Sequence, residues 1–218
     1  MSSKAAGKKG IVEGSGPLPP QQPVKIFGNF MYAEMRTICN LMDIAKRAYR
    51  VESAGDTFTE AGAKDEASFN PSQAMPLVVV NETKILADPA TLAKHICRHF
   101  QVEQLYPLAA NMDSERQKID QILEVVFLHF KLCGDRLLKL TVRAKAAAAG
   151  KLNLTSEQLA SQEAAIAYEK TVVETAVMRT INTWLEETEV SYLVTDRVSA
   201  ADIAAFHTLK QAMVFGEM

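Results

Sequence analysis

The spacing of apolar residues predicts short strands and helices in the first half of the chain. Residues 24–28 form a predicted strand, and 32–48 form a predicted helix because apolar residues recur on one face at steps of three and four. That face holds Met35, Ile38, Leu41, Met42 and Ala45. A second strand is expected at 49–53, while 54–70 is polar and irregular, with room for one helical turn.

The stretch 70–91 reads NPSQAMPLVVVNETKILADPAT and predicts a strand hairpin. Pro76 has no N–H to donate to a sheet, so it must precede the strand that begins at Leu77. An X-Pro step is also where a cis peptide is tolerated. A polar turn at 81–84 joins this strand to the next one.

The end of the same stretch predicts the start of a helix over 88–101. Asp88 suits the N-cap position and Pro89 the first helical position. The resulting order, β-α-β-(α)-β-β-α, indicates a small α/β unit.

Helical periodicity predicts long helices in the second half. Residues 112–149 lack proline, and Gly150 ends their pattern. The recurring apolar residues are Ile119, Ile122, Val126, Phe130, Cys133 and Leu137. Thr155 and Gln158 form a predicted capping box for a second long helix.

The second long helix carries an apolar stripe, and a third helix follows it. The stripe consists of Val173, Val177, Ile181 and Leu185. Residues 199–202 read Ser-Ala-Ala-Asp and cap a helix that runs to about Met213. We therefore expect an α/β domain at 24–101 and an all-helical domain at 112–218, with the boundary near Pro107.

Composition excludes several classes of function. The chain has 218 residues, and its 48% hydrophobic content suffices for a full core. Its formal net charge of -2 gives no indication of a nucleic-acid or acidic-membrane partner. No apolar run approaches the roughly 20 residues that cross a bilayer. Three widely spaced cysteines argue against a disulfide framework and favour a reducing compartment. The cytosol is expected, with an organelle as the alternative.

Residues 1–23 are rich in Gly, Ser and Pro and are expected to form a flexible tail. Two interpretations of this tail stay open. It is either an inert extension or a docking arm for a partner.

Metal and dithiol chemistry find little support in the sequence. His95 and His99 have a spacing that suits a metal, but no third ligand lies nearby, so a solvated helix face and no metal site are expected. No Cys-x-x-Cys motif occurs. Cys39 falls inside the first helix, where burial is expected rather than reactivity.

Three segments resemble the glutathione S-transferase superfamily, and the theta class in style. NPSQAMPLVV is similar to the family's Asn-Pro-x-x-x-Val-Pro-x-Leu segment, and LADPATLAKHI is similar to its Leu-x-Glu-Ser-x-Ala-Ile helix start. YLVTDRVSAADIAAF is similar to the segment that ends in Ser-x-Ala-Asp. The resemblance covers the chain from about residue 24 onward. It implies a thioredoxin-like N-terminal domain that binds glutathione, followed by an all-α domain.

The resemblance also implies binding residues for glutathione. The main chain of Met75, before a cis Pro76, is expected to pair with the cysteinyl part as an added strand does. Asp88 takes the place of the acidic residue that binds the γ-glutamyl end, and Asp120 that of an aspartate that reaches the same ammonium group across a dimer interface. Gln73 is a weaker, uncharged substitute for a lysine.

Tyr32 is the candidate catalytic residue that the resemblance implies. It falls where the theta class has a catalytic serine, counting back from Arg36, and its hydroxyl is expected to donate to the glutathione sulfur and favour the thiolate. Asn29 is the alternative donor. A second alternative is that Tyr32 only begins a surface helix.

Two departures from the family pattern bear on activity. Pro89 replaces a serine and lacks both the hydroxyl and the N–H that hold a carboxylate of glutathione. Ala74 replaces the theta-class lysine. Two hypotheses follow. The first is a glutathione transferase acting on a small electrophile, and the second is a catalytically silent scaffold of the same fold in a homodimer or larger hetero-assembly.

Overall fold

The computed structural model describes residues 23–53, 75–81, 83–85 and 87–216, and its first part is built on a four-stranded sheet. The strands are β1 (Val24–Gly28), β2 (Tyr49–Ser53), β3 (Leu77–Val80) and β4 (Thr83–Ile85), in the order β2-β1-β3-β4. β1 runs parallel to β2 and antiparallel to β3, which is antiparallel to β4. The predicted strands and hairpin are confirmed. Residues 1–22 and 54–74 lie outside the described part.

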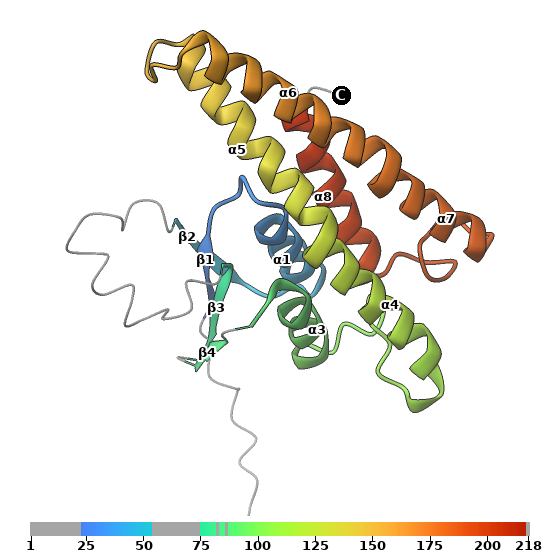
Figure 1. Cartoon of the computed structure of the whole chain (residues 1–218). Helices are drawn as coiled ribbons and strands as arrows, with labels where there is room; N and C mark the ends of the chain where they lie inside the picture. The colour runs from blue at the N-terminus through green and yellow to red at the C-terminus, as the bar shows by residue number, and fades with distance from the viewer. Residues whose placement is uncertain (1–22, 54–74, 82, 86, 217–218) are drawn as a thin grey trace, which may run out of the picture.

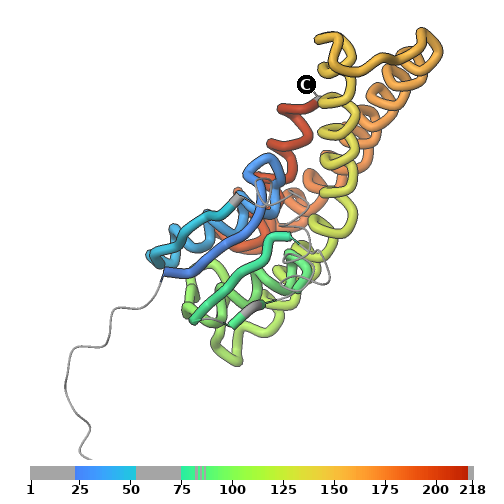
Figure 2. The backbone as a smooth tube through the Cα atoms, turned by 90° about the vertical axis from the view of Figure 1, so that its left-hand side faces the viewer, coloured from blue at the N-terminus to red at the C-terminus, as the bar shows by residue number. Residues whose placement is uncertain are grey.

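Helices α1 (Ala33–Ile44) and α3 (Pro89–His99) cover the face of the sheet that is turned toward the later helices (Figures 1 and 2). The apolar face predicted for α1 is buried, with Met35, Ile38, Leu41 and Met42 at most 1% exposed. Together with Ile26 of β1 and residues of α3 these side chains form the core beneath the sheet.

The helix predicted at 32–48 ends earlier, at Ile44. Lys46 takes a left-handed φ of 53°, and its N–H donates to Asp43 O while that of Arg47 donates to Met42 O. This is a Schellman-type ending, which glycine usually signals. Because a lysine occupies the left-handed position here, the periodic pattern overestimated the helix.

The second part is all-helical, and its long helices are not uniform. The helix predicted at 112–149 consists of α4 (Asp113–Val125), a π-helical turn η2 (Val126–Phe130) and α5 (Lys131–Ala148), after a short 3₁₀ turn at Ala110–Met112. Gly150 follows at φ 70°. The return arm consists of α6 (Ser156–Val172), a second π turn η3 (Val173–Val177) and α7 (Met178–Thr188).

The α5–α6 hairpin projects beyond the rest of the molecule (Figure 1). Its predicted capping box is confirmed, since Gln158 N–H donates to Thr155 Oγ1 at 3.2 Å and Thr155 N–H to Gln158 Oε1 at 3.0 Å. The two π turns interrupt the arms at nearly the same distance from the connecting loop, because α5 has 18 residues and α6 has 17.

Helix α8 (Ala200–Gly216) joins the two parts by packing against α1, α4 and α5. Its buried surface is rich in small side chains, namely Ala200, Ala201, Ala204, Ala205 and Ala212, which allow close helix approach. The predicted cap is confirmed. Asp202 accepts from Ser199 N–H at 2.8 Å and Ser199 Oγ–H at 2.6 Å, and also from Leu193 N–H at 2.8 Å.

Candidate functional site

A tight turn connects β1 to α1 and carries Tyr32. Asn29 Oδ1 accepts from Met31 N–H at 2.8 Å, and Asn29 O accepts from Tyr32 N–H at 3.1 Å. The Asn29 side chain is therefore committed to the turn. Tyr32 is the N-cap residue of α1, is half-buried, and its side chain makes no hydrogen bond to another described residue.

The Met75–Pro76 peptide is cis, as the sequence indicated, and lies beside this turn. Phe27 of β1 pairs with Leu77 of β3, so Gly28 is the neighbour of Pro76. A Cβ added to Gly28 would lie 3.7 Å from Pro76 Cβ and 2.8 Å from Met35 Sδ. A larger residue at the end of β1 would have to displace the Met35 side chain, whereas its distance to Pro76 would be an ordinary van der Waals contact.

Asp88 begins α3 at the same end of the sheet. β4 runs antiparallel to β3 with Ile85 opposite Val78, so the chain leaves β4 near the start of β3. Asp88 Oδ1 accepts from Thr91 N–H at 2.9 Å. Burial raises the pKa of Asp88, but hydrogen bonds from Thr91 and Ala90 outweigh it, and the net shift is downward.

Three of the sequence-predicted groups thus meet at one sheet end: the turn with Tyr32, the Met75–Pro76 step, and Asp88. Helix α1 also begins there, so the N–H groups of its first turn, which have no partner within the helix, lie at the same sheet end. Gln73 and Ala74 lie outside the described residues.

Asp120 lies elsewhere in the same chain. Its Oδ1 accepts from the Tyr106 hydroxyl at 2.8 Å, and Arg98 Nη2 donates to that same hydroxyl at 2.8 Å. Burial, with Asp120 beside it, raises the pKa of Tyr106 to about 12. Arg98 is ten residues beyond Asp88, which is roughly 15 Å along α3, so Asp120 is held near the opposite end of that helix from Asp88.

A polar network between α1, α5 and α8 was missed by sequence reasoning. Glu34, only 5% exposed, lies 3.3 Å from Lys131 Nζ, which also contacts Asp135 at 2.5 Å. Burial raises the pKa of Glu34 despite Lys131, and Glu34 Oε2 is buried without a hydrogen bond to another described residue. The i,i+4 spacing of Lys131 and Asp135 was the visible signal, but nothing local pointed to Glu34.

Arg36 connects this network to the turn. Its Nη1 donates to Phe30 O at 2.6 Å and to Met31 O at 2.9 Å. Its Nη2 donates to His207 O and Gln211 Oε1 of α8, both at 3.3 Å. The turn with Tyr32 is thereby tied to the helical part of the molecule.

His207 is neutral at physiological pH. Asn40 Nδ2 lies 3.2 Å from His207 Nε2, and an amide nitrogen only donates, so Nε2 is the acceptor. Burial, followed by Arg36 and Lys210, lowers the pKa of His207 to about 4.

The free energy of unfolding is therefore expected to fall as the pH drops from about 6.5 to 4, because in that window the unfolded chain binds a proton at His207 that the folded chain does not. Half-burial and solvent screening limit the loss to about 1–2 kcal/mol. Urea titrations at pH 7 and pH 5 measure it. A His207→Gln variant should show a flatter pH dependence, and His129→Gln, at an exposed position, is the control. Parallel pH profiles for all three proteins would contradict the prediction.

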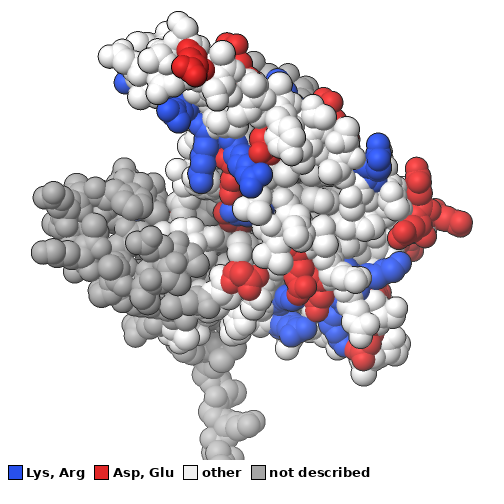
Figure 3. Space-filling view, in the orientation of Figure 1, with Lys and Arg blue, Asp and Glu red and all other residues white. Residues whose placement is uncertain are grey.

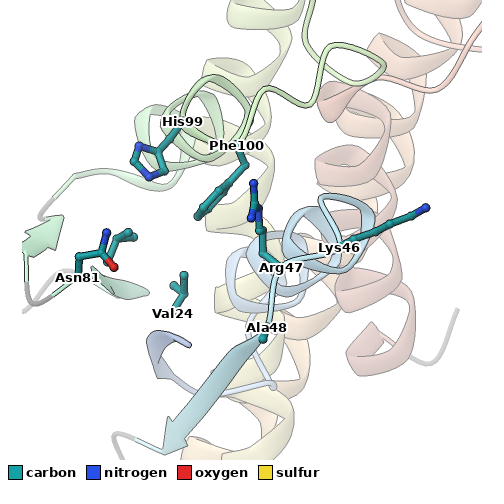
Figure 4. A pocket seen from close by; sticks show the side chains of 8 residues that line it. Val24, Lys46, Arg47, Ala48, Asn81, His99 and Phe100 are labelled. Atoms are coloured by element: carbon teal, nitrogen blue, oxygen red, sulfur yellow. The ribbon is translucent and has the colours of Figure 1, made fainter. Parts of the chain in front are cut away.

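A pocket of about 250 Å³ lies at the opposite end of the sheet (Figure 4). Val24 at the start of β1 and Ala48 lie on one side of it, and His99 and Phe100 at the end of α3 on the other. The Arg47 guanidinium lies 5.3 Å from the centre of the Phe100 ring. Val24 and Gly28 are about 13 Å apart along the strand, so this pocket is separate from the candidate site.

The face of the molecule in Figure 3 carries basic and acidic side chains side by side. Figure 3 shows basic side chains gathered over α5, whose exposed basic residues include Arg136, Lys139 and Arg143. Among the described residues no helix is both long and apolar enough to cross a membrane, and no group of three His, Cys, Asp or Glu side chains is arranged to hold a metal.

Comparison with solved structures finds glutathione transferases. Human glutathione S-transferase T1-1 in its apo form is 14% identical, with a TM-score of 0.61 over 88% of this chain and 75% of that chain. URE2P8 of Phanerochaete chrysosporium with oxidized glutathione is 13% identical, with a TM-score of 0.67 over 91% and 82%. A glutathione transferase homolog of Drosophila mojavensis with bound glutathione is 14% identical, with a TM-score of 0.54 over 88% and 78%.

No protein-family sequence model matches the chain, and no curated protein matches it by sequence. At these identities the structural likeness establishes the architecture, and it confirms at that level the resemblance carried by the three sequence segments. The chain has the glutathione S-transferase fold, a thioredoxin-like domain followed by an all-helical domain.

Proposed function

We propose that the chain binds glutathione at the sheet end formed by the Tyr32 turn, Met75–Pro76 and Asp88, and transfers its thiolate to a small electrophile. The observation that carries the proposal is the meeting of these three segments at one end of the sheet. Two structural neighbours with bound glutathione support this choice of ligand.

In this proposal the main chain of Met75 pairs with the cysteinyl residue, and ionised Asp88 attracts the γ-glutamyl ammonium. The Tyr32 hydroxyl donates a hydrogen bond to the sulfur at the N-terminus of α1. A hydroxyl donor and a helix N-terminus both favour thiolate over thiol, and the thiolate is the nucleophile. The Asp120 carboxylate acts on the same ammonium only from a second copy of the chain, since in its own chain it lies at the far end of α3.

A second candidate is a catalytically silent subunit of a larger assembly. The observation that favours it is the start of α3, where Asp88 already accepts from Thr91 N–H and Pro89 has no N–H to give. With Pro89, this end of the site therefore offers fewer hydrogen-bond donors to a carboxylate of glutathione than it would with a serine at that position.

Calorimetry with glutathione and a conjugation assay with 1-chloro-2,4-dinitrobenzene separate the two candidates. Tyr32→Phe is expected to lower kcat/KM about 100-fold, because it removes the donor that stabilises the thiolate, while glutathione affinity changes little. The matched control is Tyr168→Phe, at a position that is 66% exposed on α6. Absence of binding at millimolar glutathione would overturn the proposed transferase activity and favour the catalytically silent subunit. Normal turnover by Tyr32→Phe would remove only the role of Tyr32.

A further inference from the structure

The β1–α1 turn has few apolar contacts of its own. Phe30 is 51% exposed and Met31 is 41% exposed, and the Asn29 side chain accepts a hydrogen bond from Met31 N–H within the turn. The turn is held instead by its carbonyl groups, because Arg36 Nη1 donates hydrogen bonds to Phe30 O and to Met31 O. The position of the turn therefore depends on the position of the Arg36 guanidinium.

Gln211 of α8, together with the His207 carbonyl of the same helix, holds that guanidinium from the other side. The Gln211 side chain is 2% exposed, its Oε1 accepts from Arg36 Nη2 at 3.3 Å, and its Nε2 donates to Asp135 Oδ1 at 2.8 Å. Arginine only donates and a carboxylate only accepts, so both partners set the same orientation of the amide. Neither a carboxylate nor an apolar side chain satisfies both neighbours at neutral pH.

The chain of contacts closes on α1. Asp135 Oδ2 contacts Lys131 Nζ, and Lys131 Nζ contacts Glu34 two residues after Tyr32. The first turn of α1 is thus held to α8 through Arg36 and to α5 through Lys131. Buried polar groups matched in this way specify one relative placement of the packed helices.

We propose that Gln211 is a positioning residue, which acts through Arg36 to hold the turn that carries Tyr32. The helical part of the molecule thereby sets the geometry in which the sulfur is activated. This second statement rests on the proposed function, whereas the holding of the turn does not.

Hydrogen exchange of the Met31 and Tyr32 amides tests the holding directly, because both N–H groups bond to Asn29 within the turn. Gln211→Met keeps the side-chain length and removes both hydrogen bonds, so exchange of these amides should speed up about ten-fold, the effect of one lost bond of ordinary strength. Thr141→Val is the matched control. It removes a partly buried hydrogen bond between α5 and α8, from Thr141 Oγ1 to Phe215 O at 2.7 Å, that does not involve Arg36.

Kinetics test the consequence for activation. Gln211→Met should lower kcat for conjugation about ten-fold, with KM for glutathione nearly unchanged, if one ordinary hydrogen bond positions the turn. Gln211→Glu retains an oxygen for Arg36 but places a second negative charge beside Asp135. As the pH falls, one of these two carboxyl groups takes up a proton and the repulsion is relieved. Its activity relative to the parent protein should therefore recover toward lower pH, while that of Gln211→Met should not.

The outcomes separate the two claims. If the Met31 and Tyr32 amides exchange at the same rate in Gln211→Met, Thr141→Val and the parent protein, the inference is overturned, whatever the activity. Faster exchange only in Gln211→Met, in a chain that binds no glutathione, supports the holding of the turn and removes the proposed function. Faster exchange with unchanged kcat overturns the link to activation.

Discussion

Replacing Lys131 by methionine is expected to lower the free energy of unfolding by about 3–5 kcal/mol, because it leaves a buried carboxylate without its cation. The Glu34 side chain is 6% exposed and the Lys131 side chain 19%, so water compensates little for the loss. Asp135 loses the same partner. Chemical denaturation at pH 7.5 measures the change.

The pH dependence identifies the cause. The pKa of Glu34 is raised in the folded chain, so between its unfolded and folded values the folded state binds more protons, and stability rises as the pH falls. Without Lys131 this pKa rises further. The loss in free energy of unfolding caused by Lys131→Met should therefore become smaller toward pH 5. The double variant Lys131→Met with Glu34→Gln should lose much less free energy of unfolding than Lys131→Met alone. A deficit of less than about 1 kcal/mol, the range of an exposed ion pair, would contradict the prediction.

Removing the Asp202 carboxylate should cost nearly as much. In Asp202→Ala the Ser199 N–H, the Ser199 hydroxyl and the Leu193 N–H all lose their acceptor, and Ser199 is 3% exposed. Unsatisfied buried donors cost about 1–3 kcal/mol each, and partial access of water reduces the sum to about 3 kcal/mol.

Thermal or urea unfolding provides the measurement for Asp202, with Thr155→Ala as control. Thr155 caps the exposed start of α6, where loss of the cap costs about 1 kcal/mol. Equal losses for the two variants would show that Asp202 contributes no more than an ordinary helix cap. Leu193 belongs to the segment before α8, so this segment should also become more open to proteolysis in Asp202→Ala.

Much of the fold follows from local signals in the sequence. The strands, the hairpin and the starts of α3, α6 and α8 were predictable because each depends on neighbouring residues, such as Asp88 with Pro89 or Thr155 with Gln158. The end of α1 was not predictable, because a lysine occupies the left-handed position that glycine usually marks. The π turns were hidden because the single extra residue that each one absorbs is lost among the ordinary steps of three and four in the apolar pattern.

The candidate site was predictable in part for the same reason. Tyr32, the Met75–Pro76 step and Asp88 were each predicted from the sequence, and strand register places their segments at one end of the sheet. Their support was invisible, because Arg36 and Gln211 are 175 positions apart and meet only in the packed structure. The pairing of Asp120 with Tyr106 was hidden too, since a tyrosine next to a proline gives no sign of a buried hydrogen-bond partner.

The two π turns mark places where the length of this chain is free to change. A π turn absorbs one residue more than the α-helix around it, and the helices on either side keep their faces in phase. Loss of one residue within 126–130 or 173–177 would restore an unbroken α-helix with the same sides buried. The same loss within α5 would rotate every later residue of that helix by about 100° and expose its core positions. The two turns stand 18 and 17 residues from the connecting loop, so single-residue insertions and deletions in homologous chains are expected to gather at this level of both arms.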